Sequence, residues 1–524
     1  MTHRGENENV ARAAGIVGMA TMLSRIFGFI RDMVVAAFFG AGIATDAFFV
    51  AFRIPNLLRR LLGEGSLTVA FIPVFTEYLK TKSRESALEL ASIALTFLSI
   101  VLVLVSMAGV LLSPLVVSLM APGFLKNPEQ FDLAVFLTRI MFPYIFFISL
   151  VALCMGILNS LRHFAAPALA PVVLNISMIL TTLLLHRSFE QPITALAVGV
   201  MLGGALQLAM QWPVMIRMGA ILKPNFHFRH PGMKRIGRLL IPTLVGSGIY
   251  QINIFIGTIL ASILPKGSVS FLYYADRVVE LPLGVFAIAV GTASLPSLSA
   301  QVAKGLFEDF KKTISFSLRL ILFITIPATI ALIALREPIV SVLFQRGAFD
   351  AYSTRMTAQA LLFYTVGLWA FSVIRVIDSA FFSLQDRKSP LKAAAVSLIV
   401  NVGLSVLLMF PLKHGGLALA TSAASAVNVL MLSYILWKKI GTFLDTQFYS
   451  SVAKACVASV VMAVSFYLVT LFFPWNIEAP FDARVLFLST SIAAGILTFF
   501  GTSFLLKSDE MVALLNVIRR KLKS

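Results

Sequence analysis

Several arginines and carboxylates lie in a part of the sequence that is otherwise apolar enough to cross a membrane. Residues 24–78 are about two membrane spans long, and a charged side chain at the centre of a bilayer costs about 2.5 to 3.5 kcal/mol on insertion scales. Such side chains usually face a bundle interior, a water-filled cavity or a partner. This stretch is therefore predicted to form the floor of a substrate cavity. The charged residues behind this prediction are Arg25, Arg31, Asp32, Asp46, Arg53, Arg59, Arg60 and Glu64.

The chemistry that these residues favour is the binding of an anion. The arginines outnumber the carboxylates that could neutralise them, and the planar guanidinium forms paired hydrogen bonds to phosphate. A phosphate or pyrophosphate head group is thus the predicted ligand. In an alternative interpretation, the arginines extend to the membrane interface or form buried structural salt bridges. The carboxylates available for such pairs are Asp32, Asp46, Asp276 and Glu280.

Helical spacing predicts which of these side chains share a face. In the first span Arg25 and Asp32 are seven residues apart, about two turns, so they lie on one stripe. Arg31 reaches the same site only if the helix bends, and Gly28 between the two arginines permits a bend.

The second span carries a similar stripe. Asp46, Arg53 and Arg60 recur every seven residues, with Asn56 between them. Pro55 removes a backbone hydrogen bond near the middle, which predicts a polar and locally bent face.

A third set of charges lies in the segment YYADRVVELPLG. Asp276 and Glu280 are four residues apart, and Arg277 comes three residues before Glu280. Residues three or four apart are neighbours on a helix surface, so Arg277 could be held by a carboxylate of its own helix.

The composition shows what kind of protein positions these residues. Among the 524 residues 58% are hydrophobic and 13% are charged, and uncharged runs of about 20 residues recur. Those runs are apolar on all sides, which excludes the alternating pattern of a β-barrel. The fold class is therefore an all-α polytopic membrane protein. The polar N-terminus has no compact apolar region with a cleavage site, so we expect the first span to be retained.

Several function classes have no support in the sequence. Cys154 and Cys456 are the two cysteines and lie in apolar runs, and the histidines lack metal-ligand spacing, so neither a disulfide framework nor a metal site is predicted. The basic residues behind the net charge of +19 fall in short loops, which indicates topology setting and not nucleic acid binding. No P-loop, nucleotide fingerprint or nucleophile–base pattern is present, so no catalytic residues are predicted.

Hydropathy predicts fourteen spans, and alternate loops between them are rich in Lys and Arg. Those basic loops should be cytoplasmic, which also places both termini in the cytoplasm. The spans are centred in residues 13–39, 44–62, 88–120, 131–159, 167–186, 193–218, 236–264, 269–297, 314–344, 356–384, 391–410, 416–438, 452–473 and 483–506.

An internal repeat supports this count. SPLVVSLMAPGF from Ser113 matches EPIVSVLFQRGAF from Glu337, pairing Pro114 with Pro338 and other positions at the same displacement of 224 residues. Six spans separate the copies, which predicts two similarly oriented lobes with the cavity between them. The predicted domains are an N-lobe at 1–225, a C-lobe at 226–445, and two last spans outside the repeat at 446–524.

Four long motifs resemble one known family. SRIFGFIRD, TDAFFVAFRIPNLLRRLLGEG, AFIPVFTEY and SVSFLYYADRVVELPLGVFAIAVGTASLPSLS look like the MurJ (MviN) family of lipid II flippases, of the multidrug, oligosaccharidyl-lipid and polysaccharide exporter superfamily. The resemblance implies fourteen helices, two lobes around a cationic cavity, and a groove near the last two helices for the polyprenyl tail. Family members move the undecaprenyl-pyrophosphate-linked peptidoglycan precursor to the outer leaflet of the bacterial cytoplasmic membrane by alternating access. No covalent chemistry is implied.

Site residues follow from the resemblance by position. The arginines of SR, RD, NLLRR and YYADR are Arg25, Arg31, Arg59 and Arg277, and the resemblance implies that they contact the head group. The stripe argument favours Arg60 over Arg59, but the Pro55 kink invalidates straight-helix geometry beyond it, so the family match is preferred. The residues expected to support or gate the cavity are Ser24, Asp32, Asp46, Asn56, Asp276 and Glu280.

The expected partners are lipid II and membrane lipids, and they could include the cell-wall synthesis machinery. No cofactor is expected. The membrane potential, worth about 2.3 kcal/mol per charge per 100 mV, or an ion gradient could drive the cycle. A hard-cation site would need carboxylates, yet the predicted spans 236–264, 391–410 and 416–438 contain none. The alternatives are a related exporter of another polyprenyl-linked glycan or of drugs, and a membrane scaffold without transport.

Overall fold

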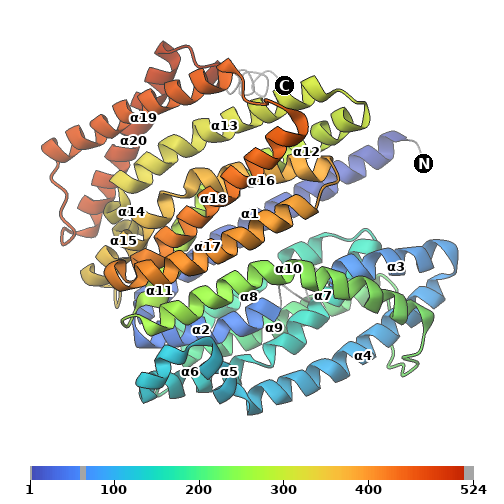
Figure 1. Cartoon of the computed structure of the whole chain (residues 1–524). Helices are drawn as coiled ribbons and strands as arrows, with labels where there is room; N and C mark the ends of the chain where they lie inside the picture. The colour runs from blue at the N-terminus through green and yellow to red at the C-terminus, as the bar shows by residue number, and fades with distance from the viewer. Residues whose placement is uncertain (1–2, 59–66, 513–524) are drawn as a thin grey trace. The chain divides into compact units, whose positions relative to one another are not determined.

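A computed structural model describes residues 3–58 and 67–512 of the chain (Figure 1). Arg59, Arg60 and Glu64 therefore lie outside the described residues. Within the two described ranges, every regular element is a helix. The helices group into two compact units, Met1–Val269 and Ser270–Ser524.

The first unit holds the elements up to α10. These are α1 (His3–Phe39), α2 (Ile43–Leu58), α3 (Leu67–Thr81), α4 (Arg84–Leu111), α5 (Ser113–Met120), the 3₁₀ helix η2 (Pro122–Lys126), α6 (Pro128–Met141), α7 (Tyr144–Ser160), α8 (Ala165–Leu185), α9 (Thr194–Arg217) and α10 (Pro231–Ile263).

The second unit holds the elements from α11 onward, although α11 begins two residues before the boundary. These are α11 (Ser268–Pro282), the π-helical turn η3 (Leu283–Ala287), α12 (Ile288–Ala303), α13 (Phe307–Ala334), α14 (Arg336–Phe344), α15 (Ala351–Thr365), α16 (Leu368–Ser383), α17 (Lys388–Leu412), α18 (His414–Ile440), α19 (Thr446–Phe472) and α20 (Phe481–Leu505).

Many of these helices can cross a membrane. Among the described residues, nine are long and apolar enough, with α6 and α7 counted as one, and the pair α15 and α16, bent by 42°, would make a tenth. The all-α polytopic class is therefore confirmed. Each of the fourteen predicted spans coincides with one or more helices. Within the described residues, four of them, 13–39, 44–62, 236–264 and 269–297, are not among the spans that helix length and composition indicate; α2, for example, is only 16 residues long. The count of fourteen remains a prediction.

Helix α3 was not among the predicted spans. It packs on α4, α7 and α10, where Phe71, Phe75 and Tyr78 are buried. Its polar residues Glu77 and Lys80 interrupt the apolar run, which is why the hydropathy pattern placed a loop there.

Breaks in the helices coincide with proline or with close packing. Pro282 cannot donate a backbone hydrogen bond, and the π-helical turn η3 follows it directly. Gly367 marks the bend between α15 and α16. A Cβ atom at this glycine would lie 2.7 Å from the Cα atom of Ser422, so α18 approaches too closely for a side chain.

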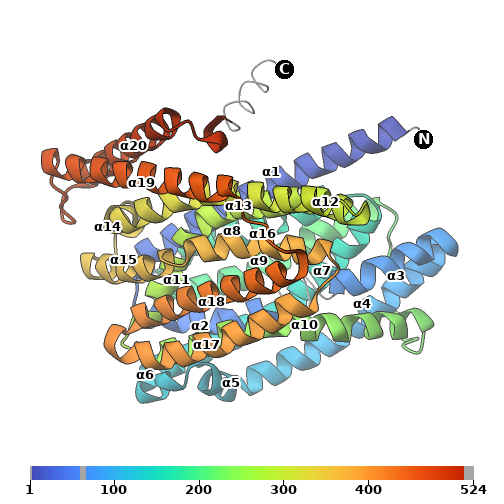
Figure 2. The same cartoon turned by 45° about the horizontal axis from the view of Figure 1, so that its top comes forward.

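Separate apolar clusters hold each unit together. In the first unit Phe71, Leu90 and Leu153 join α3, α4 and α7. In the second unit α13, α16 and α18 share one cluster, while Phe323, Phe466 and other residues join α13 to α19 and α20. Figure 2 shows α17 and α18 lying side by side within this unit, as their contacts also indicate.

The repeat is visible locally. Pro114 lies in the short helix α5 and Pro338 in the short helix α14, and each short helix directly follows a long one. Helix α10 packs on α3, α4 and α5 and so belongs to the first compact unit, although the sequence repeat would begin the second lobe at residue 226. The compact units are defined by contacts and the lobes by repetition, so the lobe boundaries stay a prediction.

Candidate substrate site

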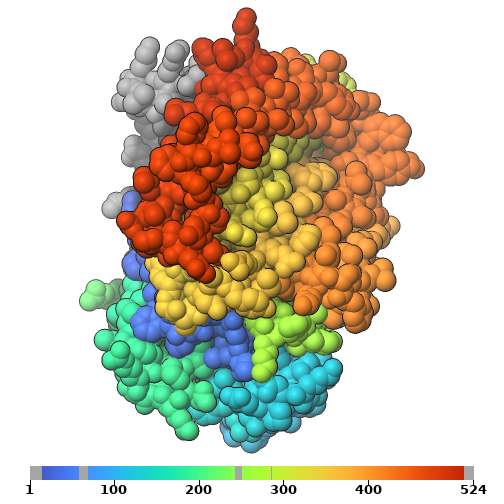
Figure 3. Space-filling view, turned by 90° about the vertical axis from the view of Figure 1, so that its left-hand side faces the viewer, coloured from blue at the N-terminus to red at the C-terminus, as the bar shows by residue number. Residues whose placement is uncertain are grey.

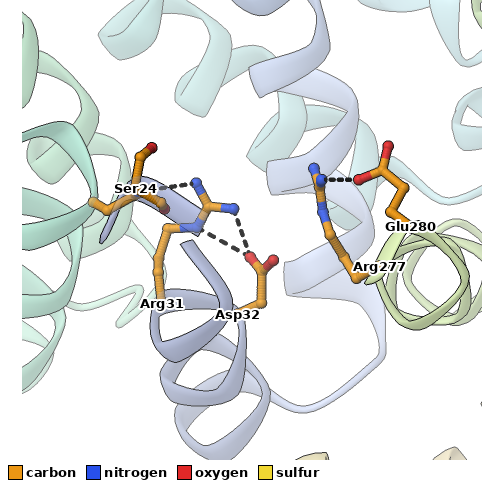
Figure 4. A network of polar contacts seen from close by, with 6 residues as sticks. Ser24, Arg31, Asp32, Arg277 and Glu280 are labelled. Carbon is orange, nitrogen blue, oxygen red and sulfur yellow. Dashed lines mark hydrogen bonds and ion pairs between the residues drawn. The ribbon is translucent and has the colours of Figure 1, made fainter. Parts of the chain in front are cut away.

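Arg31 is the most constrained of the predicted head-group arginines. It donates from Nε and Nη2 to the Oδ1 atom of Asp32, at 3.0 and 2.7 Å (Figure 4). The side chains of this pair are only 12% and 3% exposed. Burial weakens solvent screening, so this pair holds the guanidinium in a defined position. The prediction that Asp32 supports an arginine of the site is consistent with this geometry.

Asn175 of α8 also contacts Arg31. Its Oδ1 atom accepts a hydrogen bond from Nη1 of Arg31 at 2.9 Å, and its Nδ2 atom donates to the backbone carbonyl of Ser24 at 3.2 Å. The residue is buried, with 6% of its surface exposed. Sequence reasoning missed Asn175, although a single amide inside an otherwise apolar span was a usable signal.

Arg25 and Asp32, which were predicted to share one stripe of the first helix, do not form an ion pair. Arg25 is exposed, and within the described part of the chain it has no carboxylate within ion-pair distance, whereas Asp32 pairs with its sequence neighbour Arg31. Helix α1 continues without interruption through Gly28. Sequence neighbours point about 100° apart on a helix, so their pairing depends on side-chain length and not on a shared stripe.

On α2, the first two members of the predicted stripe contact the backbone and the helix α10. Asp46 is buried and accepts a hydrogen bond from the backbone N–H of Gly267 at 2.7 Å. Arg53 donates to the hydroxyl of Thr258 at 2.5 Å and to the carbonyl of Ile254 at 3.3 Å. The contacts of Arg53 fix α2 to α10, and that of Asp46 fixes α2 to the segment between α10 and α11, a structural role that the spacing had not indicated. Asn56 is half-buried on the same helix.

Arg277 is held by its own helix, as the sequence predicted. Its Nη1 atom donates to Oε2 of Glu280 at 2.7 Å (Figure 4), and the guanidinium lies 4.8 Å from the centroid of the Tyr273 ring. The side chains of Arg277 and Glu280 are 29% and 51% exposed. Asp276, next to the arginine, is exposed.

The two arginine–carboxylate pairs differ in how easily they can open. Breaking a buried pair costs several kcal/mol, whereas an exposed pair contributes about 0 to 1 kcal/mol. Arg277 can therefore exchange the carboxylate of Glu280 for a phosphate oxygen at little cost. Arg31 is better suited to present an already oriented guanidinium. The predicted contact Arg59 lies outside the described residues.

An apolar pocket of about 300 Å³ lies between α19 and α20, the last two helices of the second unit. Figure 3 shows the face of the molecule on which these helices lie, coloured red. A pocket of this composition suits an alkyl chain, because no charged group would need to lose its water. Its lining residues are Ser465, Leu468, Val469, Phe472, Phe473, Thr490 and Ala494.

Comparisons with known proteins agree with this architecture. The family model described as "Lipid II flippase MurJ" matches residues 35–485. A protein of Buchnera aphidicola named "Probable lipid II flippase MurJ" is 38% identical over 462 residues, which cover 88% of this chain and 90% of that protein.

Two solved structures are also similar. A lipid II flippase MurJ in an inward closed conformation is 29% identical, with a TM-score of 0.79, over 93% of this chain and 97% of that one. An inward-facing multidrug resistance transporter of the MATE family is 16% identical, with a TM-score of 0.64, over 82% of this chain and 98% of that one. The second likeness concerns the fold alone.

Proposed function

The chain belongs to the lipid II flippase MurJ family, and we propose how its own residues carry out the flipping of lipid II that defines this family. It is a multi-pass membrane protein, and the substrate implied by its family is lipid II. The family consists of transporters, so we infer that no bond of the substrate is made or broken and that the chain is not an enzyme.

We infer that the pyrophosphate of lipid II binds to Arg25, Arg31, Arg59 and Arg277. The observation that carries this assignment is that Arg31 and Arg277 are already oriented by ion pairs. A guanidinium nitrogen of each lies 2.7 Å from a carboxylate oxygen of its own helix. A pyrophosphate can replace Glu280 on the exposed Arg277, while Asp32 and Asn175 keep Arg31 oriented. Asp46 and Arg53 serve the site indirectly, because they hold α2 against neighbouring chain segments.

The polyprenyl chain of the substrate is assigned to the pocket between α19 and α20. Its lining is mostly aliphatic and aromatic, and a lipid chain buried there keeps the apolar surroundings that it has in the bilayer. The head group then crosses while the chain stays in an apolar environment. This assignment gives the last two helices, which lie outside the predicted repeat, a role in substrate handling.

The transport cycle is proposed to use alternating access, starting from a site open to the cytoplasm in the inner membrane. Both termini are placed in the cytoplasm by the distribution of Lys and Arg among the loops. No cofactor enters the proposal. A net charge that moves through the membrane field gains about 2.3 kcal/mol per 100 mV, so the potential or an ion gradient can reset the cycle. Membrane lipids and the cell-wall synthesis machinery are the proposed partners besides the substrate.

Complementation of a flippase-depleted bacterium tests the residue assignment. Arg25→Ala, Arg31→Ala, Arg59→Ala and Arg277→Ala are expressed singly, and membrane abundance is measured together with lipid II in the outer leaflet. Normal abundance with lost outer-leaflet lipid II supports head-group recognition. Arg229→Ala is the matched control, because Arg229 is exposed in the loop before α10. Full rescue by all four variants would refute the site, and lost abundance would favour structural salt bridges.

The export of drugs or of another polyprenyl-linked glycan is the second candidate function. The MATE-like fold is compatible with it, but a 16% identical neighbour carries no information about the substrate. A transport assay with wild-type protein separates the candidates. Export of a cationic drug without movement of lipid II would support the second.

A further inference from the structure

A second group of cationic side chains lies in the second unit and has no role in the proposed site. Arg346 follows the short helix α14, and Arg484 lies in the first turn of α20. Their guanidinium carbons are 5.2 and 5.9 Å from the centroid of the same ring, that of Phe481. Two cations thus flank one aromatic side chain.

Neither guanidinium has a carboxylate partner among the described residues. Arg346 donates from Nη2 to the carbonyl of Val342 at 2.6 Å, and Arg484 donates from Nη1 to the hydroxyl of Ser341 at 2.8 Å. The Nε atoms of both arginines are buried and, within residues 3–58 and 67–512, have no hydrogen-bond partner. A buried donor without a partner is costly, so a ligand that supplies acceptor oxygens would be stabilised here.

The two positive charges also act on each other. Partial burial, and then the charge of Arg484, lower the pKa of Arg346. A guanidinium nevertheless stays protonated in proteins, so the two like charges remain side by side. An anion placed between them would remove this repulsion.

The repeat indicates that the fold itself does not require these polar residues. At the displacement of 224 residues, Ser341, Gln345 and Arg346 correspond to Val117, Ala121 and Pro122 of the first copy. The first copy forms the same short helix, α5, with none of the three polar side chains.

Gln345 positions Arg484 indirectly, through the Ser341 hydroxyl to which Arg484 donates. Its Oε1 atom accepts a hydrogen bond from Ser341 at 2.6 Å, and its Nε2 atom donates to the carbonyl of Ile477 at 3.0 Å. Ile477 lies in the segment that leads into α20, so this bond holds the start of α20 against α14. The arrangement therefore depends on specific polar contacts between segments that are far apart in the sequence.

The cluster lies close to the apolar pocket along α20. Arg484 comes six residues before Thr490, a lining residue of the pocket, which corresponds to about 9 Å along the helix axis. Figure 3 shows α19 and α20, in red, against the yellow segment that contains α14 and α15, and α14 packs on α20. A lipid with a phosphate head group and a long chain matches both features.

We propose that Arg346 and Arg484 form a second lipid-phosphate site, which binds the pyrophosphate of a polyprenyl lipid whose chain lies between α19 and α20. The inference rests on the proposed function, which supplies this lipid and the membrane orientation. In that orientation the cluster faces the outer side, because the loops that contain Arg346 and Arg484 alternate with the basic loops. The site receives the head group after it has crossed and before the lipid leaves.

Binding to the purified full chain in detergent tests the site, with undecaprenyl pyrophosphate as the probe. Hydrogen–deuterium exchange of residues 341–352 and 476–490 reports binding at this location. The double variant Arg346→Gln, Arg484→Gln should lose the ligand-dependent protection and require about tenfold more ligand to regain it. Arg355→Gln removes the same charge from an exposed position on α15 and should behave as wild type. Unchanged protection in the double variant would overturn the proposal.

Further measurements show which phosphate-containing ligand the site prefers and whether the Gln double variant fails only because it is misfolded. Inorganic pyrophosphate and phosphatidylglycerol should both protect less than the polyprenyl lipid. Equal protection by either would overturn the assignment of a polyprenyl chain. Arg346→Lys with Arg484→Lys keeps both charges and should retain most of the binding, whereas a loss as large as that of the Gln variant, at an unchanged unfolding temperature, would contradict charge recognition.

Failure of this inference can be told apart from failure of the proposed function. Lipid II movement by the wild-type protein tests the function by itself. If the wild type moves lipid II and the Gln double variant still shows full local protection, only the second site is refuted. If the wild type does not move lipid II, the proposed function is refuted and the second site loses its substrate.

Discussion

Arg31 of α1 donates a hydrogen bond to the side-chain oxygen of Asn175 of α8 at 2.9 Å, across 144 residues of sequence. The side-chain amide of Asn175 also donates to the backbone carbonyl of Ser24, which lies seven residues, about two helical turns, before Arg31. Asn175 therefore holds both the guanidinium and the helix that carries it. A predicted substrate contact is in this way supported by a residue from a different helix.

Replacement of Asn175 should weaken the first unit and lipid II transport together. In Asn175→Leu the Nη1 group of Arg31 loses its acceptor, and a buried group without a partner costs about 1 to 3 kcal/mol. Thermal unfolding of the purified protein measures the loss. Asn175→Asp keeps an acceptor for Arg31 and serves as the control. An unchanged unfolding temperature in Asn175→Leu would show that this bond does not contribute to stability.

The Arg31–Asp32 pair should behave as a buried unit. Asp32→Leu removes the carboxylate that lies 2.7 Å from the Arg31 guanidinium, whose side chain is only 12% exposed, and we expect the free energy of unfolding to fall by about 3 to 5 kcal/mol. The double variant Arg31→Leu, Asp32→Leu removes both charges and should be more stable than Asp32→Leu, although inactive. Denaturant unfolding of the wild type, Arg31→Leu, Asp32→Leu and the double variant gives the comparison, and strict additivity of the two single changes would argue against coupling.

Glu280 should compete with the substrate for Arg277. The pair is 29% and 51% exposed, so Glu280→Gln should change the stability by less than about 1 kcal/mol. The substitution takes away the Glu280 carboxylate that competes with the ligand for Nη1 of Arg277, and binding of undecaprenyl pyrophosphate should become tighter. A titration with undecaprenyl pyrophosphate compares the affinity of this variant with that of Asp445→Asn, which also replaces a carboxylate by an amide, at the start of α19. Weaker binding in Glu280→Gln would mean that Glu280 orients Arg277 for the ligand and does not compete with it.

Filling the pocket between α19 and α20 should reduce binding of the lipid chain. Ala494 lines the pocket, and in Ala494→Trp the indole ring would occupy part of its volume of about 300 Å³. We expect weaker binding of undecaprenyl pyrophosphate and unchanged binding of inorganic pyrophosphate. Ile496→Trp places the same ring on an exposed position of α20 and is the control. Equal affinities in the two variants would exclude the pocket as the chain-binding groove.

Properties that depend on local spacing were predictable from the sequence. Runs of about 20 apolar residues indicate helices that span a membrane, because such a helix satisfies all its backbone hydrogen bonds internally. The pair Arg277–Glu280 follows from a separation of three residues on one helix. The motifs around Arg25, Arg31 and Arg277 led to the same family as the comparisons.

Contacts between distant segments were decided by the tertiary structure. The partners Asn175 for Arg31 and Thr258 for Arg53 lie on other helices, more than 140 residues away. The shared ring of Phe481 brings Arg346 and Arg484 together from segments 138 residues apart. Helical periodicity states which face a residue lies on but not which helix covers that face. The sequence by itself therefore determined the class of fold, the family and the pairs within one helix. Only the packing of the helices decided which charged side chains are held by a partner and which are left to meet a ligand.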